Sequence, residues 1–109
     1  MPGTKLVRVS PQKLRELFNS GQYYERVQAG QLLAVVGTDR HPSAPAANEP
    51  FCTRSQIVYY YDVQQRRKVA IVHQYLRRDG SIGASGRPDP KRIRDGDTIY
   101  TLKLPSTPT

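Results

Sequence analysis

One segment of this chain, His73–Lys91, contains most of the side chains whose types and spacing could do chemistry. Its sequence, HQYLRRDGSIGASGRPDPK, places a histidine, three arginines, a lysine, two aspartates and two serines around three glycines. A stretch that only joins two secondary-structure elements rarely concentrates so many charged and hydrogen-bonding groups, and binding residues are often carried on loops. We therefore expect the functional site to lie here.

The glycines of this segment follow a G-x-x-G-x-x-G spacing at Gly80, Gly83 and Gly86. Glycines let backbone amides approach a phosphate closely, and Ser81 and Ser85 could donate further hydrogen bonds. The pattern lacks the lysine of a Walker loop, and its two prolines disfavour the helix that follows a dinucleotide fingerprint. A hairpin tip that binds no ligand is the alternative.

His73 is the one candidate general base in the segment. Neighbouring arginines would lower the pKa of the imidazole and keep it neutral near pH 7. A metal-independent, toxin-like ribonuclease could be built on it, with cations around the scissile phosphate. The residues of that site would be His73, Arg77, Ser85, Arg87 and Lys91. The simpler interpretation is a half-buried histidine bonded to a neighbouring backbone group.

Positive charge is concentrated in the second half of the chain. The 109 residues have a net charge of +8, and residues 63–109 contain ten Lys or Arg against four Asp or Glu. A basic field of this kind attracts polyanions, of which nucleic acid, RNA or DNA, is the commonest. The main expectation is therefore a small basic nucleic-acid-binding protein that acts mainly through phosphate contacts of the 73–94 segment. The residues expected to contact nucleic acid are Arg66, Arg67, Lys68, Arg77, Arg78, Arg87, Lys91, Arg92 and Tyr60.

The run Tyr59-Tyr60-Tyr61 adds aromatic rings to this expectation. Because side chains alternate along a strand, either Tyr60 or the pair Tyr59 and Tyr61 faces the core, and the other set is exposed. An exposed ring could stack on an unpaired base. Tyrosine is also common in strands for packing reasons alone.

The pattern of apolar residues predicts an α+β fold, with one N-terminal helix packed on a curled antiparallel sheet of about four to six strands. The helix follows Ser10, which suits an N-cap, begins at Pro11 and ends before Gly21. Leu14, Leu17 and Phe18 form its apolar stripe. Residues 1–104 form a single domain in this interpretation, and residues 105–109 form a flexible tail.

The expected strands are short. They are Lys5–Val9, Gln22–Gln28, Gln31–Val36, Ser55–Val63, Arg67–Leu76 and Thr98–Leu104. Tyr23 and Tyr24 could instead extend the helix. The Pro-rich segment Gly37–Thr53 predicts a long loop, and the pattern assigns no strand to residues 77–97.

A single cysteine, Cys52, and the lack of a signal-like N-terminus indicate a cytoplasmic protein. The longest apolar run, Leu32–Val36, is too short to span a membrane. His41, Cys52 and His73 lack zinc-ligand spacing, so no metal or cofactor is expected. A third functional possibility is an interaction module of a mobile element whose 37–53 loop docks on an acidic protein. The chain could be a monomer or a homodimer.

The runs TRSQIVYYYD and HQYLRRDGSIGASGRPDPKRI are similar to those of a group of short uncharacterised bacterial proteins that share a His-Gln-Tyr…Asp-Gly-Ser…Pro-Asp-Pro-Lys stretch. This likeness covers about the second half of the chain and implies no particular function. The order of a helix followed by an antiparallel sheet also resembles the barnase class of small ribonucleases, in architecture only.

Overall fold

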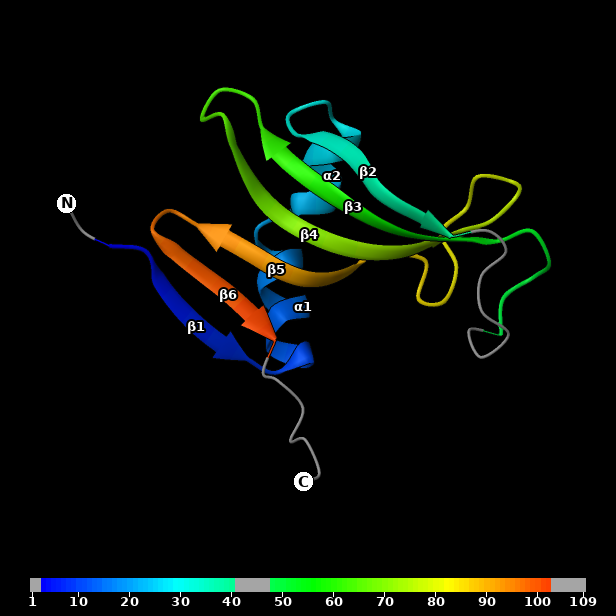
Figure 1. Cartoon of the computed structure of the whole chain (residues 1–109), viewed down its shortest axis with the longest axis horizontal. Coiled ribbons are helices and arrows are strands. Elements are labelled where there is room, and N and C mark those ends of the chain that lie inside the picture. The colour runs from blue at the N-terminus through cyan, green and yellow to red at the C-terminus, as the bar shows by residue number, and fades with distance from the viewer. Residues whose placement is uncertain (1–2, 41–47, 103–109) are drawn as a thin grey trace.

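In the computed structural model, residues 3–40 and 48–102 form two short helices packed on one face of a six-stranded sheet (Figure 1). The strands are β1 Lys5–Val9, β2 Leu33–Arg40, β3 Arg54–Asp62, β4 Arg67–Leu76, β5 Asp89–Asp95 and β6 Thr98–Leu102. The helices are α1 Pro11–Ser20 and α2 Tyr23–Gln28. Neither helix of this described part is long and apolar enough to cross a bilayer. The α+β class is confirmed.

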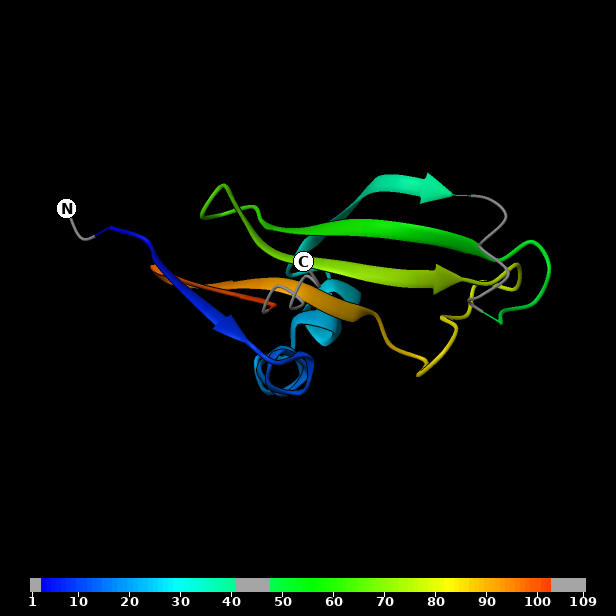
Figure 2. The same ribbon diagram turned by 60° about the horizontal axis from the view of Figure 1, so that its bottom comes forward.

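The sheet is open and twisted, with the strand order β1-β6-β5-β4-β3-β2 (Figure 2). All neighbours pair antiparallel except β1 and β6, which are parallel. The expectation of a purely antiparallel sheet is therefore wrong at this one edge. A parallel pair needs a long connection between its strands, and here the rest of the chain separates β1 from β6.

Helix α1 follows the predicted local signals. The Ser10 Oγ accepts a hydrogen bond of 3.1 Å from the Lys13 N–H, and a proline occupies the first helical position. Leu14 and Phe18 are fully buried on its apolar stripe, which lies mainly across β5. A Cβ at Gly21 would come within 2.5 Å of the Tyr23 ring, so glycine allows the chain to turn tightly there.

The sequence pattern predicted a strand at Gln22–Gln28. This prediction is wrong, because residues 23–28 form helix α2. Tyr23 and Val27 lie four residues apart on the helix, and both pack against the core. The Tyr23 ring stacks on Phe18 with 5.9 Å between the centroids. Gln22 has a left-handed backbone (φ 54°), so α2 is a new helix and not an extension of α1.

The β3–β4 hairpin is confirmed, whereas β5 was missed because prolines lie on both sides of its first residue, Asp89. Pro90 is buried opposite Val72, and the register shifts by one residue at Lys91, between the Pro90 and Arg92 pairings. Such an irregularity is where a strand tolerates a residue that has no N–H to donate.

The predicted loop Gly37–Thr53 begins too early, because β2 continues to Arg40 through a bulge at Gly37. Residues 41–47 lie outside the described residues, as do the last two residues of the predicted final strand and the predicted tail 105–109.

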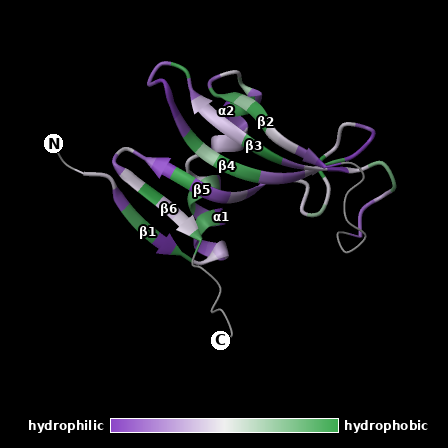
Figure 3. Ribbon diagram, viewed as in Figure 1, coloured by the Kyte–Doolittle hydropathy of each residue, from purple (hydrophilic) through white to green (hydrophobic). Residues whose placement is uncertain are grey.

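The core lies between the helices and the sheet. Hydrophobic residues are concentrated in the middle of β3 and β4 (Figure 3), and Val58, Tyr60, Val72 and Ile93 are buried toward the helices. Tyr60 is 1% exposed, and burial raises the pKa of its hydroxyl. The prediction that Tyr60 contacts nucleic acid is therefore a misassignment, because a ring enclosed in the core cannot stack on a base.

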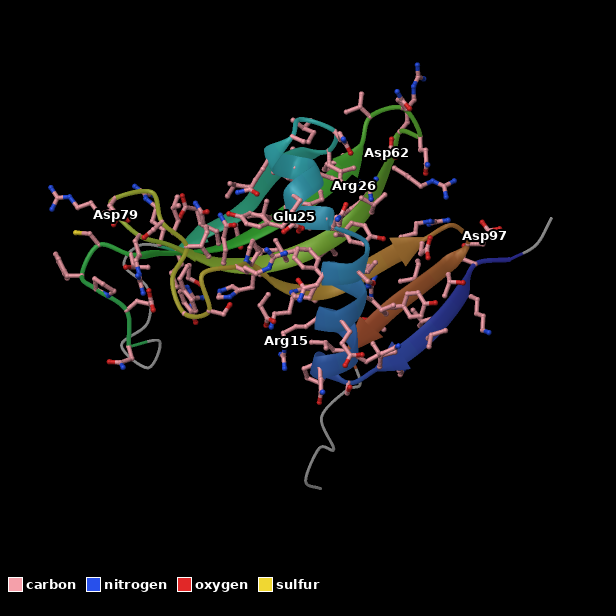
Figure 4. The ribbon with its side chains drawn as sticks, turned by 180° about the vertical axis from the view of Figure 1, so that it is seen from behind. Arg15, Glu25, Arg26, Asp62, Asp79 and Asp97 are labelled. Atoms are coloured by element: carbon pink, nitrogen blue, oxygen red, sulfur yellow. The ribbon has the colours of Figure 1, made fainter. Side chains whose placement is uncertain are left out.

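The opposite side of the sheet, which neither α1 nor α2 covers, is called the open face below. Figure 1 looks onto this face, and Figure 4 looks onto the helices. Tyr59, Tyr61, Ile71, Arg92 and Ile99 belong to the open face, since they alternate with or pair across from the residues that point into the core.

Replacement of Phe18 by alanine is expected to destabilise the fold by about 3–5 kcal/mol, because it removes a ring in contact with both Tyr23 and Tyr60. Urea unfolding followed by circular dichroism measures this loss. Phe51→Ala is the matched control, since Phe51 is 85% exposed and its loss should change stability by less than about 0.5 kcal/mol. Equal effects of the two substitutions would contradict the assigned core.

Candidate functional site

The segment His73–Lys91 is the end of β4, a tight loop and the start of β5, and a carboxylate from elsewhere in the chain holds it together. The Arg77 Nε donates to the Glu49 Oε1 at 2.9 Å, and the Ala84 N–H donates to the Oε2 at 3.2 Å. The Glu49 side chain is 6% exposed. The hydrogen bond from Arg77 lowers the pKa of this carboxyl. A Cβ at Gly83 would overlap the carboxylate, which explains the glycine there.

The backbone amides of the three glycines are already used within the loop. The N–H groups of Gly80, Gly83 and Gly86 donate to the carbonyl oxygens of Arg77, Tyr75 and Gly83 at 2.9, 2.7 and 3.1 Å. The Asp79 Oδ1 accepts from both the N–H and the Oγ of Ser81 at 2.8 and 2.6 Å. These hydrogen bonds lower the pKa of Asp79. The glycine pattern therefore forms a self-bonded turn and not an open phosphate cradle.

The cations proposed for catalysis are paired with carboxylates. The Arg87 guanidinium forms two hydrogen bonds with Glu25, at 2.7 and 3.3 Å, and lies 5.2 Å from the centroid of the Tyr24 ring. The Lys91 Nζ lies 2.9 Å from the Asp89 Oδ2. Glu25 lies on α2, on the helix side of the molecule (Figure 4).

Four of the five proposed catalytic residues nevertheless meet. His73, Ser85, Arg87 and Lys91 line one depression of about 410 Å³. The Ser85 hydroxyl donates to the Arg87 carbonyl oxygen at 3.2 Å, and its Oγ lies 3.4 Å from the Arg87 backbone nitrogen, whose N–H donates to it. Arg77 lines a different depression and does not join the set.

His73 has a side-chain partner that sequence reasoning missed. Its Nε2 lies 2.7 Å from the Ser55 Oγ, and its ring packs edge-to-face with Tyr75 at 4.7 Å. Burial, followed by the positive charge of Lys91, lowers the pKa of the imidazole, while Asp89 opposes the shift. The direction matches the sequence expectation, but the cause is burial and a lysine, not the neighbouring arginines.

A second group of cations surrounds a depression of about 180 Å³ on the open face, here called the four-cation depression. Its basic residues are Arg67, Lys68, Arg92 and Arg94, and its apolar floor is formed by Val69, Ala70, Ile71 and Ile99. Among the residues that the structure describes, no carboxylate lines it. Arg94 was not predicted as a site residue.

Three contacts hold basic side chains of the four-cation depression. The Arg67 Nη1 and the Arg94 Nε both donate to the Gly96 carbonyl oxygen, at 3.4 and 3.1 Å. The Lys68 Nζ lies 4.4 Å from the centroid of the Tyr59 ring, a cation–π contact. Three of the four cations, Arg67, Lys68 and Arg94, are therefore held in place before any ligand arrives.

Arg8 shares the open face with these residues. The register places Arg8 opposite Thr101, which lies opposite Arg92. Neighbouring strands are about 4.8 Å apart, so the Cα atoms of Arg8 and Arg92 are about 10 Å apart. No local signal identifies Arg8, because its position depends on the pairing of β1 with the last strand.

The remaining predicted contact residues lie at the two ends of β4. Arg66 is exposed in the β3–β4 turn beside Arg67, and Arg78 is exposed in the turn after β4. Figure 4 shows the latter turn, marked by Asp79, at the opposite end of the molecule from Asp97. The predicted footprint is thus divided between two ends of one strand.

Metal ligands do not gather in the described ranges 3–40 and 48–102, where no group of three His, Cys, Asp or Glu residues could hold an ion. His41 and most of the Pro-rich loop predicted to dock on an acidic protein lie outside these ranges. No protein-family model, curated protein or solved structure matches this chain.

Removal of the Glu49 carboxylate is expected to loosen the 77–86 loop without unfolding the sheet. In Glu49→Ala the Ala84 N–H loses its acceptor and Arg77 loses its ion pair, so hydrogen exchange should accelerate at Gly83 and Ala84. Amide exchange measured by NMR checks this, with the exposed Glu16→Ala as control. Unchanged exchange at Ala84 would contradict the assigned role.

The same loosening is expected in the wild-type protein at low pH. Because Arg77 lowers the Glu49 pKa below its ordinary value of 4.5, the carboxylate stabilises the loop fully above about that pH. Its contribution is lost as the pH falls through the lowered pKa. An acid titration of the Ala84 amide shift measures this, and a transition centred above pH 4.5 would contradict it.

Proposed function

We propose that this protein binds nucleic acid, or another polyanion, through phosphate contacts on the open face of its sheet. The observation that carries the proposal is the four-cation depression, in which four basic side chains surround one apolar floor. Three of them, Arg67, Lys68 and Arg92, are among the residues that the sequence predicted as nucleic-acid contacts, and Arg94 is the last residue of the predicted 73–94 segment.

The geometry of the depression suits phosphate groups. A guanidinium presents a planar fork of donors that matches a phosphate, and an ammonium adds a compact charge. Because Gly96 holds Arg67 and Arg94 and the Tyr59 ring holds Lys68, less side-chain entropy is lost on binding. Arg8 of β1 and the exposed Arg66 in the β3–β4 turn add positive charge to the surface around the depression.

The loop cations contribute less to this proposal than the sequence suggested. Arg77, Arg87 and Lys91 each form an ion pair with a carboxylate of the protein itself. A phosphate would have to compete with those carboxylates, whereas none lines the four-cation depression in the part of the chain described. The proposed interface is therefore centred on β4 and β5.

Binding of RNA or DNA is expected to weaken steeply with salt, because phosphate contacts release counterions. Arg92→Ala should weaken binding roughly fivefold at low salt and reduce the slope of log K against log salt by about one. Fluorescence anisotropy across a salt series measures both. Lys13→Ala, which removes one charge from the exposed side of α1, is the control. An affinity that does not change with salt would contradict the proposal.

A metal-independent ribonuclease is the second candidate, and the depression lined by His73, Ser85, Arg87 and Lys91 is the observation in its favour. A lowered pKa keeps His73 neutral at pH 7 and able to accept a proton. The carboxylate partners of Arg87 and Lys91 weigh against it, because they offset the charge that a scissile phosphate needs.

For the ribonuclease, His73→Ala should abolish cleavage of labelled single-stranded RNA and leave binding nearly intact. The wild-type rate should rise with pH through a pKa below 6.5 and then level off, because only the neutral imidazole acts as a base. Gel analysis of RNA after incubation across pH measures this. Intact RNA with the wild-type protein, or undiminished cleavage by His73→Ala, would eliminate this candidate.

A further inference from the structure

Four side-chain rings lie on the open face of the sheet and are not part of the hydrophobic core. Tyr59 and Tyr61 of β3 and His73 and Tyr75 of β4 point to the side of the sheet away from the helices, and each is half-buried. We call these four residues the ring row. Rings of this size are usually buried or used in binding when they lie on an uncovered surface.

The ring row follows the β3–β4 hairpin. Tyr61 lies opposite Lys68 at one end, and Ser55 lies opposite Tyr75 at the other. These ends are six residues apart on β3, or about 20 Å at about 3.3 Å per residue. Lys68 also lines the four-cation depression, so one end of the ring row meets the proposed phosphate site.

A further ring lies beyond the other end of the row. Phe51 precedes β3 and is 85% exposed. Its neighbour Cys52 lines a depression of about 460 Å³ together with Arg54 and Arg78. The Glu49–Arg77 ion pair anchors this segment to the loop after β4. An exposed ring therefore precedes β3 at this end, next in the chain to a depression lined by arginines, of which Arg54 alternates with the residues of the ring row.

The rings differ in their availability. The Lys68 ammonium already lies over the Tyr59 ring, and the His73 imidazole is bonded to Ser55. No hydrogen bond involves the Tyr61 or Tyr75 hydroxyl within the described residues. Among the described residues, Tyr61 and Phe51 make no aromatic or cation–π contact, and Tyr75 contacts one ring, that of His73, edge-to-face at 4.7 Å. These three rings are therefore the ones left to contact a ligand.

Rings next to cations suit unpaired bases better than a duplex. Bases of a single strand can stack on aromatic side chains while basic residues contact the backbone. In a duplex the bases stack on one another, and a helix or a two-stranded ribbon must enter a groove to reach their edges. Both described helices lie on the other side of the sheet (Figure 4), so neither can enter a groove from the open face.

Building on the proposed function, we infer that the ligand is single-stranded nucleic acid lying along the β3–β4 hairpin. Its bases stack on Tyr61, Tyr75 and Phe51. Its phosphates contact the four-cation depression at one end and Arg78 at the other.

The test compares three ligands by fluorescence anisotropy and competition: a single-stranded oligonucleotide, the duplex of the same sequence, and inorganic polyphosphate. The single strand should bind about tenfold or more tightly than either of the others. Phe51→Ala and Tyr75→Leu should each weaken single-strand binding about fivefold or more and leave polyphosphate binding unchanged. Tyr75→Phe keeps the ring and should retain full affinity, as should Val63→Ala, which removes an exposed apolar side chain that has no ring.

The outcomes separate this inference from the proposed function on which it rests. Duplex or polyphosphate bound as tightly as the single strand, or full single-strand affinity in both Phe51→Ala and Tyr75→Leu, would overturn the inference and leave phosphate binding standing. The absence of salt-dependent binding to all three ligands would overturn the proposed function itself.

Discussion

The packing of Phe18 against Tyr23 and Tyr60 decides which side of the sheet is available for function. Its ring lies 5.9 Å from the first and 6.2 Å from the second, so one residue joins both helices to the centre of the sheet. Side chains alternate along a strand, and burial of Tyr60 therefore turns Tyr59 and Tyr61 to the open face. The same alternation places Ile93 in the core and Arg92 and Arg94 outside it.

Positive charge is divided by the same arrangement into two populations. Three cations in the loop after β4 and in the start of β5, Arg77, Arg87 and Lys91, are paired with Glu49, Glu25 and Asp89, and they stabilise a local conformation. Cations on the open face surround a depression that no carboxylate lines within the described residues. A net charge of +8 does not distinguish the two populations, and a phosphate would have to compete with a carboxylate only in the first.

Local signals predicted the elements whose contacts are near in sequence. The capped helix α1 and the β3–β4 hairpin depend on Ser10, Pro11 and a short turn, so a single sequence identifies them. Helix α2 and strand β5 depend on distant partners. The Tyr23 hydroxyl donates to the carbonyl oxygen of Arg94, 71 positions away, and Pro90 enters a strand because the register with β4 shifts at the next residue. Neither condition can be read from nearby residues.

The amino-acid sequence by itself determined the fold class and the basic segments that supply Arg67, Lys68 and Arg92. It could not distinguish free cations from paired ones, because Glu49 lies 28 positions from Arg77 and Glu25 lies 62 from Arg87. Nor could it show that Arg8 lies on the open face or that Ser55 contacts His73, because both facts depend on the register of the strands. Tertiary structure alone decided which rings are buried and which charges are paired, because both depend on contacts between residues far apart in the chain.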